Sequence, residues 1–307
     1  MAWSVTGPFV AVSTRRCGNS VSLVFAGVCS HGPGITGRSE QADPAVRDAF
    51  YENFHRMRDA IEATRPDALV VVAAEHFANF FMNNMPSLAI GMAEHYEGPI
   101  EDEAWLGIER RRIPGNAALS KRLIERIMRT SDVAYAEEWL FDHGIMVPLH
   151  FLTPRYDLPI VPVNINCQGP PLIPLDRTWE FGCALREAID NVPERIALVG
   201  TGGLSHWPAT PDSGVINEAW DREFLERWCL GDREALCAFT DEETYREAGQ
   251  GGFEIRTHVA VAGACAGSKG RVWFYAPIPI FAVGCTIATM EVSEAGLAGN
   301  DPSGDER

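Results

Sequence analysis

Four of the eight histidines stand where imidazole side chains can do chemistry. His31 and His76 each follow an apolar run of the kind that forms a buried strand, whereas His143 and His206 are expected in the glycine-containing loops Asp-His-Gly and Gly-Gly-Leu-Ser-His. Imidazole is a common metal ligand, and it exchanges protons near neutral pH. Two histidines and one carboxylate form the facial triad typical of non-haem Fe(II), which leaves positions open for substrate and oxygen. The pattern therefore indicates a metal site with proton-transferring histidines beside it.

The carboxylate of such a triad has two candidates. Glu254 is one, because the glycine-rich turn 249–252 delivers it to the start of a predicted helix. Glu75 adjoins His76, but successive strand side chains point to opposite faces, so both reach one metal only if the chain bends there. Each histidine taken singly can also be structural, and two histidines with a glutamate also suit a catalytic zinc.

The neighbours of these residues leave further alternatives open. Asp142 is placed to orient His143, although His143 can instead cap a helix or bond to the backbone. His258 follows Glu254 by one helical turn, which would put it close to the site. Three histidines are interpreted as structural or surface residues: His55, which lies inside a predicted helix, and His95 and His150, which lack motif context.

Other catalytic signatures are missing from the sequence. The segment 201–203, Thr-Gly-Gly, follows a predicted strand, but no Gly-Lys-Ser or Gly-Lys-Thr comes after it, which argues against a phosphate-binding loop. No Gly-x-Ser-x-Gly segment marks a nucleophilic serine. Arg256 and Arg271 are candidate anchors for a substrate carboxylate, with a plain surface position the favoured interpretation of each.

Apolar runs and helical periodicity predict the elements that carry these residues. Strands are expected at 21–29, 68–74, 87–92, 133–136, 159–164, 196–201, 272–275 and 280–286. Helices are expected at 44–64, 116–130, 178–191, 216–230, 241–248 and 253–266. This alternation predicts an α/β fold with a central mixed, partly parallel sheet flanked by helices. Because the carboxyl ends of parallel strands meet at one edge, the active site is expected at the strand ends.

Composition limits the expected partners and compartment. The 307-residue chain is 46% hydrophobic and has a formal net charge of −16 without a Lys/Arg block, so neither nucleic acid nor a membrane surface is expected as a partner. No apolar run reaches the ~18 residues of a membrane span. The eight cysteines include no Cys-x-x-Cys pair, which favours reduced core thiols in a cytoplasmic protein.

The chain is expected to contain one catalytic domain, residues 21–291. Residues 1–20 lack the apolar core and the cleavage site of a signal peptide and are interpreted as an N-terminal extension. Residues 292–307 are rich in Gly, Asp, Glu and Ser and are expected to form a disordered tail.

Six segments in this order resemble the class III extradiol (meta-cleaving) catechol dioxygenases. These are the catalytic chains of the protocatechuate 4,5-dioxygenase, gallate dioxygenase and 2,3-dihydroxyphenylpropionate dioxygenase type. The resemblance runs from about residue 25 to residue 291. The segments are Ser30-His31-x-Pro33, Glu75-His76-Phe77, Asp142-His143-Gly144, Gly200-Thr201-Gly202-Gly203-Leu204-Ser205-His206, Asn217-x-x-Trp220-Asp221-x-x-Phe224 and Phe253-Glu254-Ile255.

The resemblance implies Fe(II)-dependent extradiol cleavage of a catecholic ring in aromatic catabolism, with both atoms of O2 entering the product. By that likeness His31, His76 and Glu254 match the iron ligands. His206 matches the histidine that accepts the substrate proton and later donates one, and His143 matches a second active-site histidine that stabilises the bound diolate or oxygen.

Two departures and two alternatives accompany the resemblance. Relatives commonly have Asp where Glu75 stands, which bears on metal affinity. In protocatechuate-type enzymes the corresponding catalytic chain is paired with a small companion subunit or a fused segment. This chain is therefore expected either to be a self-sufficient homo-oligomer or to need a companion subunit. The same fold also supports metal-poor relatives that bind partners, and a zinc-dependent hydrolase could use the same ligands.

Overall fold

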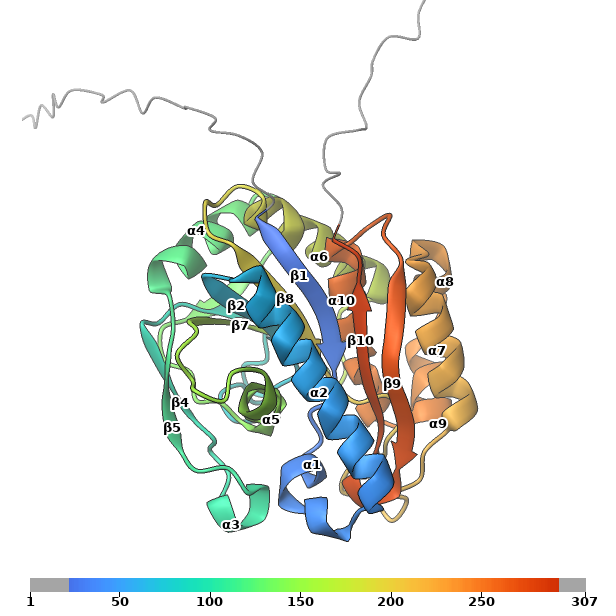
Figure 1. Cartoon of the computed structure of the whole chain (residues 1–307). Coiled ribbons are helices and arrows are strands. Elements are labelled where there is room, and N and C mark those ends of the chain that lie inside the picture. Colours follow the sequence, from blue (N-terminus) through green and yellow to red (C-terminus); the bar gives the residue numbers. More distant parts are fainter. Residues whose placement is uncertain (1–21, 293–307) are drawn as a thin grey trace, which may run out of the picture.

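The computed structural model describes residues 22–292. Eight strands form one mixed sheet (Figure 1). Their order across the sheet is β6 (Ala134–Ala136), β3 (Leu88–Gly91), β7 (Ile160–Ile165), β2 (Ala68–Ala73), β8 (Ile196–Thr201), β1 (Leu23–Cys29), β10 (Val283–Met290) and β9 (Gly270–Ile278). The four central strands β7, β2, β8 and β1 run parallel, whereas β10 and β9 continue the sheet antiparallel on one side and β3 on the other. The predicted α/β class with a partly parallel sheet is confirmed.

Side chains of the central strands are buried on both faces of the sheet. In β2, Leu69 and Val71 pack into the core on one face, and Val70 and Val72 pack into the core on the other. This two-sided burial explains why the strand reads as a continuous apolar run instead of an alternating one.

Helices cover the two faces unequally. The helices α2 (Pro44–Thr64) and α5 (His143–Leu152) share a core with one face, while α4 (Ala117–Ile127), α6 (Leu175–Ile189) and α10 (Ile255–Ala264) share a core with the other. Figure 1 shows α2 crossing the front of the sheet, with α6 and α10 behind it. The helices α7 (Glu218–Leu230), α8 (Arg233–Cys237) and α9 (Asp241–Ala248) lie on the side of β9 in the same view.

The helix α2 forms where its sequence signals place it. Asp43 accepts hydrogen bonds from the backbone N–H groups of Ala45 and Val46, and Pro44 occupies the first helical position, where no N–H is needed. A single buried stripe then faces the sheet: Phe50, Phe54, Met57 and Ile61. The predicted bounds of this helix are those observed.

Three expectations about local structure need correction. His143 was expected in a loop but is the first residue of α5, whose side chains are buried nearly all round and so leave no helical periodicity to detect. Glu254 was expected inside the first turn of a helix but ends the short helix η2 (Gly251–Glu254) directly before α10. The segment 95–114, for which no element was predicted, contains β4 (His95–Gly98), α3 (Glu103–Leu106) and β5 (Arg111–Pro114).

The strands that lead into the histidine loops end at the same level. Thr201, the last residue of β8, pairs with Cys29 of β1 on one side and with Ala73 of β2 on the other. The strands β1 and β2 are not direct neighbours, because β8 lies between them. The loops after all three strands therefore begin side by side at one edge of the sheet.

The expected extension 1–20 and nearly all of the expected tail 292–307 lie outside the described residues. Within residues 22–292, none of the helices combines the length and the apolar character needed to cross a membrane.

The close contact between α6 and α10 gives a first prediction. A Cβ on Gly182 would lie 2.1 Å from the carbonyl oxygen of Ala260, and one on Gly263 would lie 2.3 Å from that of Trp179. Alanine normally stabilises a helix interior over glycine by roughly 0.5–1 kcal/mol, whereas overpacking costs about 1–3 kcal/mol. We therefore expect Gly182→Ala to lower the free energy of unfolding, measured by urea denaturation.

The exposed residue Glu187 in the same helix supplies the control. Glu187→Ala removes only a surface ion pair with Arg126, so its free energy of unfolding should change by less than about 1 kcal/mol. A stabilised Gly182→Ala would contradict the close approach of the two helices.

Candidate active site

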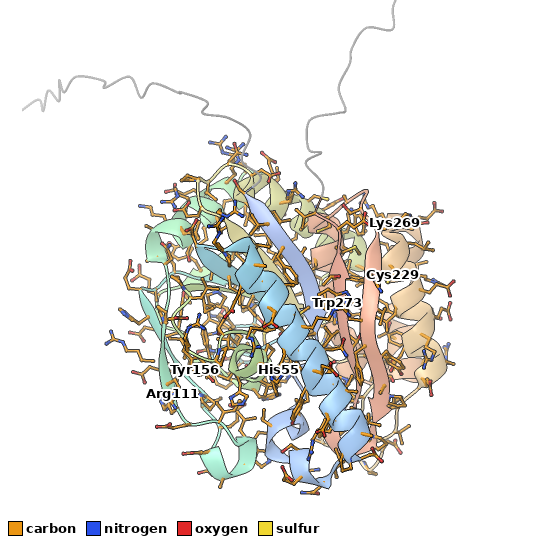
Figure 2. All side chains as sticks on the ribbon, in the orientation of Figure 1. His55, Arg111, Tyr156, Cys229, Lys269 and Trp273 are labelled. Atoms are coloured by element: carbon orange, nitrogen blue, oxygen red, sulfur yellow. The ribbon has the colours of Figure 1, made fainter. Side chains whose placement is uncertain are left out.

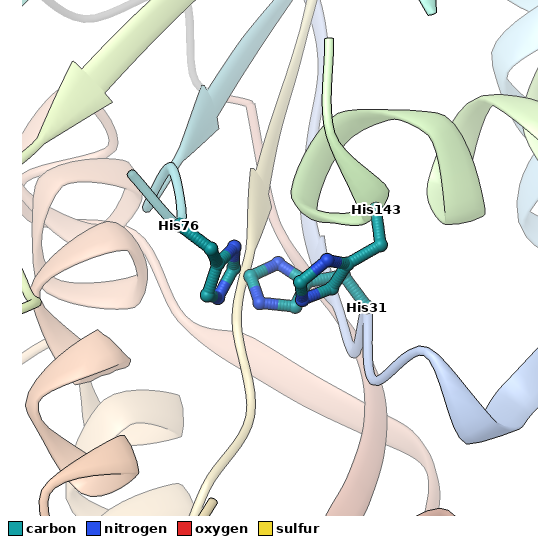
Figure 3. Close-up of side chains that lie close together, drawn as sticks. All are labelled: His31, His76 and His143. Carbon is teal, nitrogen blue, oxygen red and sulfur yellow. The ribbon is translucent and has the colours of Figure 1, made fainter. Parts of the chain in front are cut away.

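Three histidines from different parts of the chain meet beyond the carboxyl ends of the central strands. Figure 3 shows His31 after β1, His76 after β2 and His143 at the start of α5. The ring centroids of His31 and His76 lie 5.2 Å apart, and those of His76 and His143 lie 4.0 Å apart. Each of the three offers a ligand atom, and these atoms all lie within 4.8 Å of one another. The geometry thus supplies a candidate metal-binding group.

The Nδ1 atoms of His31 and His76 are both held by acceptors. Thr201 donates its hydroxyl to the carbonyl of Gly144 at 2.7 Å, so its oxygen can accept from His31 Nδ1 at 3.1 Å. His76 Nδ1 lies 3.0 Å from Asp142 Oδ2, which also accepts the backbone N–H of His76 at 2.6 Å. These partners assign the proton of each neutral ring to Nδ1 and leave the Nε2 lone pair for a metal or a proton.

His143 and His206 are fixed in the same way. His143 Nδ1 lies 2.6 Å from Glu101 Oε1, and this oxygen also accepts the backbone N–H of His143. His206 Nδ1 donates to the carbonyl of Leu204 at 2.7 Å. All four rings therefore keep Nε2 free of a backbone or Asp partner, and burial lowers the pKa of both His143 and His206.

Glu254 faces three of these Nε2 atoms. Its carboxylate oxygens lie 3.2 Å from Nε2 of His31, 3.3 Å from Nε2 of His76 and 3.8 Å from Nε2 of His206. Nε2 of His31 is buried and makes no hydrogen bond with any described residue. Lone pairs of imidazole and carboxylate this close repel one another unless a positive charge sits between them, so the residues fit a metal cation.

The charges of the site favour a cation at the same place. Burial alone would lower the pKa of His76, but attraction to Asp142 and Glu254 more than offsets it and raises that pKa to about 10. Burial likewise works against the charged form of Glu254, yet the neighbouring His31 and His206 hold its pKa well below the usual range. A carboxylate anion that remains ionised in a buried site is the partner that a divalent metal requires.

Glu75, the rival carboxylate, is occupied elsewhere. It is buried, and its oxygens accept the backbone N–H groups of Ala78, Asn79 and Phe80 at 2.5, 2.9 and 2.8 Å. This cap folds the loop that follows His76 and leaves Glu254 as the carboxylate among the imidazoles.

Sequence reasoning assigned the wrong partner to one of the carboxylates that orient the histidines and missed another. Asp142 was expected to orient His143, but it bonds to His76 and caps α5 through the N–H of Gly144. The carboxylate beside His143 is Glu101, which lies 42 residues earlier in a segment without a predicted element. No local signal in the sequence could have paired them.

A cavity of about 330 Å³ opens onto the histidine cluster. The residues that line it include the four histidines and the carboxylate described above: His31, His76, His143, His206 and Glu254. Most of the remaining wall is apolar and includes Pro33, Trp105, Ile280, Phe281 and Val283. The ring of Trp105 lies edge-on to His143 at 6.2 Å, and its side chain is 50% exposed. A flat aromatic molecule fits such a wall, because ring faces and edges pack well against one another.

The cavity also shows which sequence candidates lie outside the site. His55, which is labelled in Figure 2, and His95 and His150 are exposed, as expected. His258 is fully buried but does not line the cavity, and burial lowers its pKa to about 4. None of His55, His95 and His150 forms a hydrogen bond or ion pair with Glu254 or with the clustered histidines.

Both arginines singled out as carboxylate anchors also lie outside the cavity. Arg271 is an exposed residue of β9, so its interpretation as a surface residue is confirmed. The surface interpretation is wrong for Arg256, which is 1% exposed and forms an ion pair with Asp241. Sequence reasoning missed Arg38, the one arginine or lysine among the described residues that lines the cavity.

Comparison with known proteins places this site in a family. Residues 26–285 match the family described as the catalytic LigB subunit of aromatic ring-opening dioxygenase. The chain is 29% identical to the 2,3-dihydroxyphenylpropionate/2,3-dihydroxicinnamic acid 1,2-dioxygenase of Cupriavidus necator, covering 78% of this chain and 89% of that protein. The protein of the same name from Rhodococcus jostii is also 29% identical, with 85% and 96% covered.

A solved structure supports the fold independently. The crystal structure of an uncharacterized protein from Escherichia coli K12 matches with a TM-score of 0.56 at 18% identity, over 78% of this chain and 92% of the other. Since the family match spans well over half of the sequence, the chain belongs to the LigB family of catalytic subunits of aromatic ring-opening dioxygenases.

Proposed function

We propose that the chain is an Fe(II)-dependent extradiol dioxygenase that opens a catecholic ring beside its two hydroxyl groups, with residues 21–291 as one catalytic domain. The observation that carries this proposal is the approach of the Glu254 carboxylate to within 3.3 Å of Nε2 of both His31 and His76. Both atoms of O2 enter the ring-opened product, so the reaction balances without another reductant.

The proposed iron ligands are His31, His76 and Glu254. Two nitrogens and one carboxylate oxygen are the donor set that suits non-haem Fe(II) and leaves coordination positions open. When bound there, the metal would offset the charge of the deprotonated diol and relay electron density from the diol to O2.

His206 is proposed as the acid–base residue, and His143 is proposed as a hydrogen-bond donor to the diolate or to oxygen. His206, with its Nδ1 proton bound to Leu204, presents a basic Nε2 that can accept the proton of a substrate hydroxyl and later return one. His143 is supported by Glu101, whose carboxylate would stabilise the ring once it is protonated, so that Nε2–H can donate to the diolate or to oxygen.

One alternative has its own observation. His31, His76 and His143 together form a three-histidine set, which is a common arrangement for a catalytic zinc with a bound water. A zinc-dependent hydrolase would use this set without Glu254, and a partner-binding relative would need no metal at all.

The ring substituent can be proposed from the relatives and from Arg38. The curated relatives are named for 2,3-dihydroxyphenylpropionate and 2,3-dihydroxicinnamic acid, which carry a carboxylate at neutral pH. Arg38 lines the cavity, and its side chain makes no hydrogen bond or ion pair with any described residue. We propose that its guanidinium binds a carboxylate on the substrate ring.

We further propose a cytoplasmic location and a homo-oligomeric assembly for the chain. The seven cysteines of residues 22–292 are all free, which supports a reducing, cytoplasmic location. Exposed apolar side chains such as Phe81 and Met82, 51% and 61% accessible, support assembly into a homo-oligomer. A small companion subunit is the alternative assembly.

The function is tested by oxygen uptake of anaerobically Fe(II)-reconstituted protein with a panel of catecholic compounds and the related 2-aminophenol. The panel contains catechol, protocatechuate, gallate, 2,3-dihydroxyphenylpropionate and 2-aminophenol, and the absorbance of a ring-opened product is followed in parallel. We expect one O2 consumed per diol cleaved, with zinc-loaded protein inactive. Iron-loaded protein without uptake on any diol would contradict the dioxygenase assignment, and ester or amide hydrolysis by zinc-loaded protein would favour the alternative.

Single substitutions separate the ligand sets. Removing a residue that only hydrogen-bonds to a metal ligand lowers metal affinity by about 10–100-fold. The affinity for Fe(II) should therefore fall by more than about 100-fold when a ligand itself is removed, as in His31→Ala, His76→Ala and Glu254→Ala. His143→Ala should retain iron, measured by anaerobic titration. His206→Ala should also retain iron but lose about 10²–10⁴-fold in kcat. Retention of iron by Glu254→Ala together with its loss from His143→Ala would instead establish the three-histidine set.

Arg38 is tested with charged and neutral substrates. A hydrogen-bonded ion pair contributes about 1.5–3 kcal/mol, so Arg38→Ala should lower kcat/KM for 2,3-dihydroxyphenylpropionate by roughly 10–100-fold. The value for the uncharged 3-propylcatechol should stay within about twofold, since that substrate loses no ion pair. Arg129→Ala, an exposed arginine outside the cavity, is the matched control. Equal losses on both substrates would refute the anchor.

A further inference from the structure

One peptide group next to the cavity is hydrogen-bonded at both ends. The carbonyl of Leu204 accepts the Nδ1 proton of His206 at 2.7 Å. The N–H of Ser205, which belongs to the same peptide unit, donates to Asp221 Oδ1 at 2.7 Å. A peptide unit is planar and delocalised, so a strong acceptor at its N–H increases the negative charge on its carbonyl oxygen. Asp221 and His206 are thus connected through a single amide.

The Asp221 carboxylate accepts from the N–H of this peptide and from a tyrosine, and it also interacts with the Ser205 side chain. Its side chain is fully buried in the first turn of α7, and the hydroxyl of Tyr275 donates to its other oxygen at 2.8 Å. A Cβ on Gly284 would lie 2.0 Å from Asp221 Oδ2, so the carboxylate fits against a position where only glycine leaves room. Burial raises the pKa of Asp221 to about 6, which leaves the group an anion above that pH.

The start of α7 makes a second contact with the loop that carries His206. Asn217 caps the helix through the N–H of Trp220, and its own backbone N–H donates to Ser205 Oγ at 2.8 Å. The loop that carries His206 is therefore attached to a helix end through Ser205 on two sides.

We propose that Asp221 is a positioning residue for His206, acting through the Leu204–Ser205 peptide. A carboxylate at the N–H strengthens the carbonyl as an acceptor, which keeps the imidazole proton on Nδ1 and the Nε2 lone pair toward the cavity. The inference rests on the proposed acid–base role of His206. It gives a positioning role to a residue that neither lines the cavity nor contacts a proposed metal ligand.

The position of Asp221 predicts a split between kinetic parameters. Asp221→Asn keeps the size of the side chain and removes its charge, so kcat should fall by about 10–100-fold while KM and iron content stay unchanged. Glu218→Gln is the matched control, because Glu218 is an exposed acid in the same turn of α7 that makes its ion pair with Arg222. Its kcat should remain within about twofold of the wild type.

The test is a double-mutant cycle in the iron-loaded full chain. If Asp221 acts only through His206, then Asp221→Asn should change kcat by less than about twofold in a His206→Ala background. An equal loss in both backgrounds would assign Asp221 a general structural role and overturn the inference. A normal rate in His206→Ala alone would instead refute the acid–base role, and the inference with it.

A spectroscopic measurement on the full chain without added metal does not depend on turnover. Long-range ¹⁵N–¹H correlation should show the Nδ1–H tautomer of His206, identified by its absence in His206→Ala. In Asp221→Asn the bound proton should move upfield and exchange faster with water, whereas in Glu218→Gln it should not. An unchanged Nδ1–H signal in Asp221→Asn would overturn the inference even if no substrate is turned over.

Discussion

The site depends on the register of β8 between β1 and β2. Because Thr201 stands opposite both Cys29 and Ala73, three chain segments leave the sheet at one level and can bring their first polar side chains together. A shift of one residue in β8 would also send its side chains to the opposite face of the sheet. The buried strands leave no freedom for such a shift, since their side chains fill two separate cores.

Thr201 also links the sheet to the chemistry. Its hydroxyl lies between the carbonyl of Gly144 and Nδ1 of His31, so the last residue of a core strand sets the direction of an imidazole. The other three histidines are held by Asp142, Glu101 and a backbone carbonyl. These hydrogen bonds fix the orientation of the imidazole rings before a substrate binds. Such preorganisation favours both metal binding and proton transfer.

The sequence was informative where periodicity or motif order carried the signal. The helix 44–64 and the strand ends before His31 and His76 could be located because one apolar stripe or one buried run marks each of them. His143 could not be placed on a helix, since α5 is buried nearly all round. Glu101 and Arg38 reach the site by tertiary contact alone, which no local pattern encodes.

Asp142 performs two tasks that would make different demands on a side chain. As the cap of α5 it could be replaced by serine, threonine or asparagine, which accept the same backbone hydrogen bond. As the partner of His76 Nδ1 it supplies a buried negative charge that none of those residues carries. A change to asparagine at this position would therefore keep the cap of α5 but remove the negative charge beside Nδ1 of His76, so the helix end and the imidazole do not tolerate the same replacements.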